Sequence, residues 1–266
     1  MPCRFASHAR RLSALLAIAL VGAAGGASIA TAEAPEYGTC VKAEKVGKEY
    51  KGKFKNSGCT EGVTESERAK KGKYEWYPGA PEGVMTTKGG HGLLETVGHL
   101  TVGCASETSV GEFSGTKEVK NVVVTFEGCE AGGVECNTFG SAAGELVTKK
   151  LEGIIGWESK AAKKVAFDLY PKGKTGLFIE FSCSGLTFAV QGSVLVPLSP
   201  VDKMLKSMTL KYKSKKGVQQ VTHFEGGPTD ILETSHRGLP YEQSGQTITT
   251  VLTNPENKAL ELNAVI

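Results

Sequence analysis

Two glutamates with matching neighbours are the first residues in this chain that could carry chemistry. Glu95 and Glu233 both lie in a Leu-Glu-Thr segment. A pair of carboxylates on a β scaffold is the minimum that a glycosidase requires, with one as the acid and the other as the nucleophile or base. Because the chain contains 25 glutamates, a match of this kind is also expected by chance. Glu95 and Glu233 are therefore nominal candidates for a glycosidase-like hydrolase.

Other catalytic and metal-binding patterns are weaker. The chain has three aspartates, Asp168, Asp202 and Asp230. No Gly-x-Ser-x-Gly elbow supplies a nucleophile for them. His223 and Glu225 are two residues apart, so they share one face of a predicted strand and could hold an ion with Asp230 or His236. A solvent-facing polar pair is the more common explanation. We therefore assign no catalytic residue and expect no metal and no cofactor.

An aromatic cluster is the candidate ligand-binding surface. Tyr74, Trp76 and Tyr77 lie within four consecutive residues, just before Pro78. Aromatic rings in a loop can stack on sugar rings, which would make a glycan the ligand. Large aromatic side chains also supply much of the buried area of a protein core. We favour the second explanation, in which these rings pack the preceding segment onto the main body.

The elements that would position these residues are short strands, because neighbouring strand residues point to opposite faces. Val165, Phe167 and Leu169 alternate with Asp168, and many similar runs are separated by glycine-rich turns. Residues 65–71 favour one helical turn or a loose linker, and residues 199–205 favour a second short helical turn. The pattern predicts an all-β fold, an antiparallel β-sandwich or barrel with one sheet or two coupled sheets, stapled by disulfides and with minimal helix.

The first 32 residues have the features of a secretory signal peptide. A basic head with three arginines precedes an apolar run of 13 residues, and Ala30-Thr31-Ala32 provides the small residues of a cleavage site. The run is short against the roughly 20 apolar residues of a membrane-spanning helix. We expect cleavage after Ala32, secretion to the extracellular space or the cell wall, and no transmembrane segment in the mature chain.

The cysteines agree with export, because an even number in an exported chain is typical of disulfides. Six remain once Cys3 is removed with the leader. The predicted bridges are Cys40–Cys59, Cys129–Cys136 and Cys104–Cys183. The first two pairs are close in the sequence. Cys104 and Cys183 each share the apolar face of a predicted strand, which favours a bridge inside the core.

The predicted mature chain divides into a polar, lysine-rich N-terminal arm at residues 33–78, with its own disulfide, and a main all-β domain at residues 79–266. Residues 1–32 contain three arginines and no acidic residue, so the mature chain holds 28 basic and 28 acidic residues. A formally neutral chain has no electrostatic attraction for phosphate. Nucleic acid is therefore not an expected partner.

Several motifs together resemble an uncharacterised family of secreted bacterial proteins that has no assigned activity. They are Glu36-Tyr37-Gly38-x-Cys40, Tyr74-Glu75-Trp76-x-Pro78-Gly79, Leu94-Glu95-Thr96-Val97-Gly98, Phe126-Glu127-Gly128-Cys129 and Gly144-Glu145-Leu146-x-Thr148-x-x-Leu151-x-Gly153. The resemblance covers most of the mature chain. It implies secretion and gives no information about chemistry.

These observations predict a secreted, non-catalytic protein that acts outside the cell or in the envelope and binds an unknown extracellular ligand, with a glycan as one candidate. The alternatives are a secreted, glycosidase-like hydrolase on the same scaffold and a β-barrel carrier of a small apolar ligand. A cleft with converging carboxylates would favour the hydrolase, and an apolar interior cavity would favour the carrier. A solid core with a flat aromatic surface would favour the binding protein.

Overall fold

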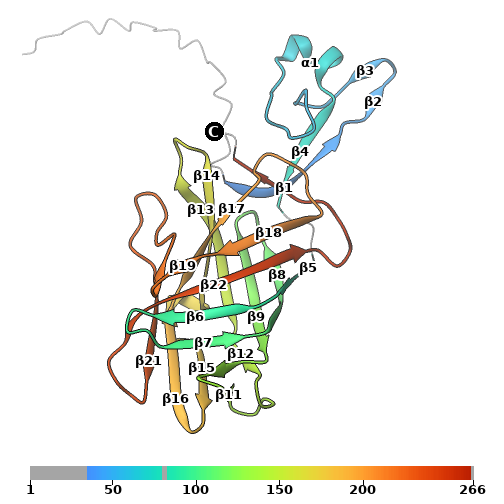
Figure 1. The fold of residues 1–266 in the computed structure, drawn as a ribbon. Coiled ribbons are helices and arrows are strands. Elements are labelled where there is room, and N and C mark those ends of the chain that lie inside the picture. Colours follow the sequence, from blue (N-terminus) through green and yellow to red (C-terminus); the bar gives the residue numbers. More distant parts are fainter. Residues whose placement is uncertain (1–34, 80–82, 265–266) are drawn as a thin grey trace, which may run out of the picture. The chain divides into compact units, whose positions relative to one another are not determined.

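The computed structural model describes residues 35–79 and 83–264, which all belong to one unit that spans Ala32–Ile266 (Figure 1). The predicted signal peptide lies outside the described residues. Strands dominate, which confirms the predicted all-β fold. The single α-helix of this part of the chain is α1 (Glu65–Lys71), at one of the two positions that the sequence favours. The helical turn predicted at residues 199–205 is wrong, because that segment runs as bends and a bridge between β17 and β18. Within the same residues, no helix is both long enough and apolar enough to cross a membrane.

Eight antiparallel strands pair in a closed ring, so the fold contains a barrel. Each strand has a hydrogen-bonded neighbour on either side, and the last strand pairs with the first. In order around the ring they are β22 (Glu242–Thr253), β21 (Leu232–His236), β16 (Leu186–Gly192), β15 (Leu177–Cys183), β11 (Val134–Asn137), β10 (Glu130–Ala131), β7 (Thr101–Cys104) and β6 (Gly92–Thr96).

A second antiparallel sheet shares β22 with the barrel, and buried side chains from both sheets belong to one apolar cluster. Its end strands lie in contact with each other. In order they are β17 (Val194–Leu198), β14 (Lys164–Pro171), β13 (Leu151–Ser159), β9 (Glu118–Glu127), β8 (Ser106–Ser114), β5 (Val84–Gly89), β22 and β18 (Ser207–Tyr212), with β12 (Leu146–Val147) beside β9. The two coupled sheets anticipated from the sequence are thus a closed barrel and a second sheet.

The N-terminal arm is joined to the C-terminal strand. Its central strand β1 lies between β4 and β23, so the arm and the end of the chain share one small sheet. The elements outside the two large sheets are β1 (Glu36–Lys42), β2 (Lys45–Val46), β3 (Glu49–Tyr50), β4 (Tyr74–Pro78), β19 (Ser214–Lys215), β20 (Val218–Gln219), β23 (Glu261–Asn263) and the 3₁₀ turn η1 (Lys172–Lys174).

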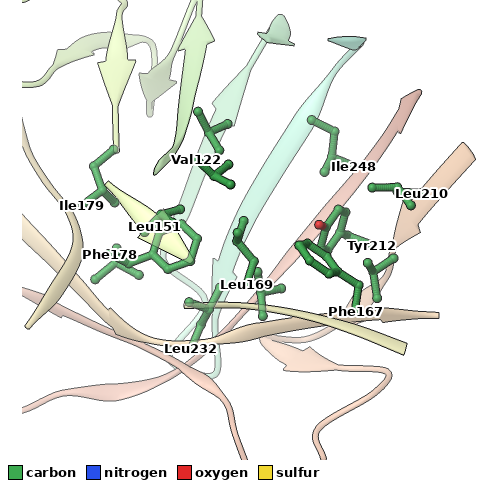
Figure 2. Packing of buried hydrophobic residues seen from close by; sticks show 14 of the residues in the cluster. Val122, Leu151, Phe167, Leu169, Phe178, Ile179, Leu210, Tyr212, Leu232 and Ile248 are labelled. Carbon is green, nitrogen blue, oxygen red and sulfur yellow. The ribbon is translucent and has the colours of Figure 1, made fainter. Parts of the chain in front are cut away.

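The core is filled from the alternating faces of these strands. Figure 2 shows Leu151, Phe167, Leu210 and Ile248, from four different strands, pointing into one shared space. The cavities that remain among the apolar side chains are small, at about 40, 60 and 40 Å³. The interior is therefore close-packed, as protein cores generally are.

Four cysteines lie in one row across four neighbouring strands, and this row corrects the predicted disulfide map. Gly103 pairs with Glu130 and Glu130 with Glu135, which sets Cys104, Cys129, Cys136 and Cys183 side by side in that order. The bridges are Cys104–Cys129 and Cys136–Cys183, so the predicted pairs Cys129–Cys136 and Cys104–Cys183 are wrong. The predicted Cys40–Cys59 bridge is confirmed.

Strand spacing explains this correction. Cys104 and Cys183 lie three strands apart, about 14 Å at the usual spacing, which no disulfide spans. The N–H group of Cys136 donates to the carbonyl oxygen of Cys129, so these two face each other as a wide, hydrogen-bonded pair. The bridged pairs are narrower, with Cα–Cα distances of 3.9 Å and 4.1 Å. Both sulfur-bearing faces are buried, as the strand phase predicted.

We predict that the Cys136→Ala/Cys183→Ala variant will lose about 4 kcal/mol of unfolding free energy, because this bridge closes a loop of 47 residues. Urea denaturation measures the loss. A non-reduced peptide digest should link Cys104 to Cys129 and Cys136 to Cys183. A peptide that links Cys129 to Cys136 would contradict the observed row.

Candidate functional site

The candidate site is a polar cleft of about 310 Å³ that lies where the chain passes from the barrel into the second sheet. This volume is several times that of any of the three core cavities, and it reaches the lower end of the range for small-molecule sites. The lining residues come from β14, β16 and β21 and from three connecting segments. They are Tyr170, Lys174, Gly192, Ser193, Thr229, Asp230, Ile231 and Glu233.

Asp168 lies beneath this cleft as a charged group in an otherwise apolar strand. Phe167 and Leu169 face the core of the second sheet, so Asp168 faces the opposite side, as the alternation predicts. That side is covered by the segment before β21, whose Val221 and Phe224 pack on the outer face of β14 and β17. The side chain of Asp168 is consequently 0% exposed.

The covering segment approaches so closely that two positions admit only glycine. At Gly192, where φ is 86°, a Cβ would lie 1.9 Å from the carbonyl oxygen of Ile231. At Gly156, a Cβ would lie 2.8 Å from the Phe224 ring. The N–H group of Ser193 donates to the Ile231 carbonyl oxygen at 3.1 Å. These contacts fix the segment over β14 and define one wall of the cleft.

Lys174 is the cation at the centre of the cleft. Its Nζ lies 3.2 Å from Asp168 Oδ2 and 3.1 Å from Asp230 Oδ2. It also lies 4.8 Å from the centre of the Tyr170 ring, in a cation–π arrangement. Burial lowers the pKa of the Lys174 ammonium, but the charges and hydrogen bonds of Asp168 and Asp230 outweigh that effect and leave the pKa above its usual value. Lys174 is therefore charged at neutral pH.

The pKa of Asp168 is unusually high for an aspartate. Burial raises the pKa to about 6, against the opposing effects of the Lys174 charge and of the hydrogen bond from Lys174. Oδ1 of Asp168 is buried and has no hydrogen-bond partner among the described residues. Desolvation therefore outweighs the ion pair, as expected for a carboxylate removed from water.

The outer part of the cleft is rich in hydrogen-bond acceptors. The Nε2 group of Gln191 donates to Glu233 Oε2 at 3.0 Å, and Asp230 Oδ2 accepts a hydrogen bond from Lys174 Nζ at 3.1 Å. The second carboxylate oxygen on each residue is an additional acceptor. Three acidic residues, Asp168, Asp230 and Glu233, accompany Lys174, which is the single basic residue among the described residues that line the cleft.

The structure brings together three acidic residues that no sequence motif links. Asp168, Asp230 and Glu233 all lie in or directly beneath the cleft. Glu95 does not line it. Glu95 lies on β6, and its Oε2 accepts the N–H group of Gly217, in the turn between β19 and β20, at 3.2 Å. The proposed pairing of Glu95 with Glu233 therefore does not form this site.

The remaining polar candidates are dispersed. Glu225 Oε2 accepts the N–H group of Lys160, and the ring of His236 lies 6.2 Å from that of Phe188. Asp202 Oδ1 accepts the N–H group of Ala264 at 2.7 Å, at the C-terminal strand. Across residues 35–79 and 83–264 there is no cluster of three or more His, Cys, Asp or Glu side chains that could hold a metal ion.

The aromatic candidates do not form one platform. Tyr74 and Trp76 lie on one face of β4, and Tyr77 lies on the other. Trp76 is half-buried, and its Nε1–H donates to Glu36 Oε1 at 2.8 Å. A Cβ at Gly38 would lie 2.2 Å from the Trp76 ring, so the ring packs on β1. Tyr77 is 56% exposed.

Sequence reasoning missed Lys174, Tyr170 and Ser193, the residues that complete the cleft. Lys174 lies in a Lys-Gly-Lys-Thr-Gly segment that looks like an ordinary polar turn. One signal was present: Asp168 is an isolated charge inside an apolar strand, and such a charge requires a partner. The partner itself could not be named from the sequence.

Comparison with known protein families, curated proteins and solved structures gives no match. The resemblance to secreted bacterial proteins therefore stays a prediction.

We predict that Trp76→Ala will lower the unfolding free energy by about 2–3 kcal/mol, because it removes a half-buried ring and leaves the buried Glu36 without its donor. Trp76→Phe keeps an aromatic ring but loses the N–H donor to Glu36, and it should lower the unfolding free energy by about 1 kcal/mol. Tyr77→Ala, at an exposed position on the same strand, should cost less than about 0.5 kcal/mol. Equal urea midpoints for Trp76→Ala and Tyr77→Ala would contradict the packing described.

The high pKa of Asp168 predicts a pH-dependent stability. The folded protein holds this proton up to a pH of about 6, whereas an unfolded aspartate releases it near 3.9. The stabilising contribution of the protonated form is therefore complete below about pH 4 and lost as the pH rises to about 6, a change on the order of 3 kcal/mol.

Asp168→Asn should remove this part of the pH profile, measured as unfolding free energy between pH 4 and 7. Glu135→Gln, at an exposed position on β11, is the matched control and should keep the wild-type slope. Superimposable profiles for wild type and Asp168→Asn would show that Asp168 titrates normally.

Proposed function

We propose that this protein is exported and acts outside the cytoplasm as a non-catalytic binding protein, and that the cleft around Lys174 binds a hydroxyl-rich ligand such as a glycan. The observation that carries the proposal is the convergence of Asp230 and Glu233 on one open cleft of about 310 Å³. Sugar hydroxyl groups each offer one donor, and carboxylate oxygens accept without donating. The cleft is therefore complementary to a dense set of hydroxyl groups.

Three disulfides support the location part of the proposal. Disulfides form and persist in oxidising compartments and are rare in the cytosol. The bridges brace both the arm and the barrel, so the fold as described depends on such a compartment. Together with the leader-like residues 1–32, this favours secretion.

Hydrolysis is less well supported than binding at this cleft. Asp168 and Asp230 both touch Lys174 Nζ, so their bonded oxygens lie no farther apart than the sum of the two distances, 3.2 Å and 3.1 Å. A close pair with one raised pKa resembles the carboxyl arrangement of a glycosidase. In a glycosidase, however, the scissile bond lies between the carboxyl groups, and here Lys174 occupies that space.

The apolar-carrier alternative has less support still. The three apolar cavities enclose about 40, 60 and 40 Å³. Pockets that hold drug-sized ligands are roughly 300–1,000 Å³. Cavities of this size accommodate a few water molecules, so the packed interior leaves the surface cleft as the better ligand site.

We predict that the protein, expressed with its own leader and purified from the extracytoplasmic fraction, will begin at Glu33 and bind defined members of a glycan array. Glu233→Gln and Asp230→Asn should each reduce binding by about tenfold or more, because each weakens charge-assisted hydrogen bonds to ligand hydroxyl groups. N-terminal sequencing and titration calorimetry provide the two measurements.

Glu135→Gln serves as the matched control, because Glu135 is exposed and does not line the cleft. It should bind as the wild type does. Retention of the protein in the cytoplasm with Met1 intact would refute export. Full glycan binding by Glu233→Gln and Asp230→Asn would refute this cleft as the site, and release of cleaved glycan would favour the hydrolase.

A further inference from the structure

The Lys174 ammonium is held as a ligand cation would be held. Two carboxylates contact it, from Asp168 and Asp230, and the face of the Tyr170 ring closes a third side. Carboxylates combined with an aromatic face are a common means of recognising an ammonium group. The cleft is therefore already built for a cation, and a side chain of the protein occupies that position.

The segment that carries Lys174 is separate from the strands that form the cleft. Strand β14 ends at Pro171 and β15 begins at Leu177, so Lys174 lies in the turn between them. Gly173 and Lys174 both have positive φ, at 67° and 56°. The second value is uncommon for a residue with a side chain and costs conformational energy.

The attachment of this turn is light. Its backbone contributes one side-chain hydrogen bond among the described residues, from the N–H group of Gly173 to Glu152 Oε2 at 3.2 Å. The Lys174 side chain is 47% exposed. The ammonium can thus leave the cleft by a movement of the turn alone, without any change in strand pairing.

Charge determines what can take its place. Without Lys174, the cleft holds Asp168, Asp230 and Glu233 and no basic residue. Asp168 is fully buried, and an ionised carboxylate that is buried without a partner costs several kcal/mol. With a neutral ligand Asp168 would have to take up a proton, whereas an ammonium group on the ligand restores both ion pairs.

We propose that the cleft binds an amino sugar, whose primary ammonium group replaces that of Lys174 between Asp168 and Asp230. The hydroxyl groups of the sugar then meet Glu233 and the outer oxygen of Asp230. This inference rests on the proposed glycan-binding function and narrows it to a cationic sugar. Lys174 acts as a tethered competitor, which keeps the buried carboxylate paired while the cleft has no ligand.

The test uses two matched probes, the glucosamine disaccharide with free amino groups and its N,N′-diacetyl form, titrated into the exported protein by calorimetry. Lys174→Met keeps the aliphatic stem and removes the charge. It should bind the amino form at least tenfold more tightly than the wild type, because a tethered group competes at an effective millimolar concentration. The acetylated form should show no such gain. Lys172→Met, in the same exposed turn, is the control and should bind as the wild type does.

A second measurement uses thermal stability, so it also applies if the Lys174 variants fold poorly. Lys174→Ala should lose thermal stability, and n-propylamine should restore part of it in Lys174→Ala alone, whereas n-propanol should not. Equal affinities of Lys174→Met and wild type for the amino form would overturn the proposal, as would equal gains for both probes. If both probes bind the wild type equally and depend on Glu233, the amino-sugar inference fails and glycan binding stands. If neither probe nor any arrayed glycan binds, both fail.

Discussion

Backbone hydrogen bonding along β22 is the constraint on which both sheets depend. The first part of this strand, from Glu242 to Thr247, pairs with β21 and β6 and closes the barrel. The later part, from Ile248 to Thr253, pairs with β18 and β5 and belongs to the second sheet. Figure 1 shows β22 as one long strand in red. A shift of one residue would turn its buried side chains outward in both sheets at once, so the register of each sheet fixes the other.

This shared strand explains where the cleft lies. Gly192 ends a barrel strand and Ser193 leads directly into β17 of the second sheet. Asp168 comes from the second sheet, while Glu233 comes from the barrel. Polar groups from the two sheets converge here, beside one of the points where the chain crosses between them. The site therefore follows from the coupling of the sheets and not from either sheet alone.

Periodicity in the sequence predicted which way side chains point, and it failed where the partner had to be known. The alternation around Asp168 correctly placed it opposite Phe167 and Leu169. The same reasoning correctly buried Cys104 and Cys183. Their partners depend on the order of the strands in the barrel, which a two-residue period does not contain. Short sequence separation favoured Cys129–Cys136, but these two residues form a wide, hydrogen-bonded strand pair. Cys129 is instead bridged to Cys104, and Cys136 to Cys183.

The same limit applies to Lys174, since its importance comes entirely from Asp168 and Asp230. These residues meet only because the segment before β21 folds back over β14. No sequence pattern near Lys174 predicts that contact. The isolated charge of Asp168 in an apolar strand indicates only that a partner is needed.

The buried acids Asp168, Glu107 and Glu261 differ in whether a cation pairs with them. Glu261 is 0% exposed, neither of its carboxyl oxygens has a hydrogen-bond partner among the described residues, and burial together with the Asp202 charge raises its pKa to about 8. Burial also raises the pKa of Glu107, which accepts the hydroxyl of Thr87 at 2.6 Å. Neither side chain has an ion pair within the part of the chain described.

Glu261 thus remains neutral at physiological pH, because ionisation without a partner is too costly in a packed core. Asp168 is equally buried, yet its pKa of about 6 leaves it ionised at neutral pH. The difference is Lys174, which reaches Asp168 from a turn at the surface. A buried charge that depends on a cation supplied from outside the core is sensitive to any other cation that can enter the same opening. The dependence of Asp168 on a cation from the surface therefore connects the electrostatics of the fold to the proposed selection of a cationic ligand.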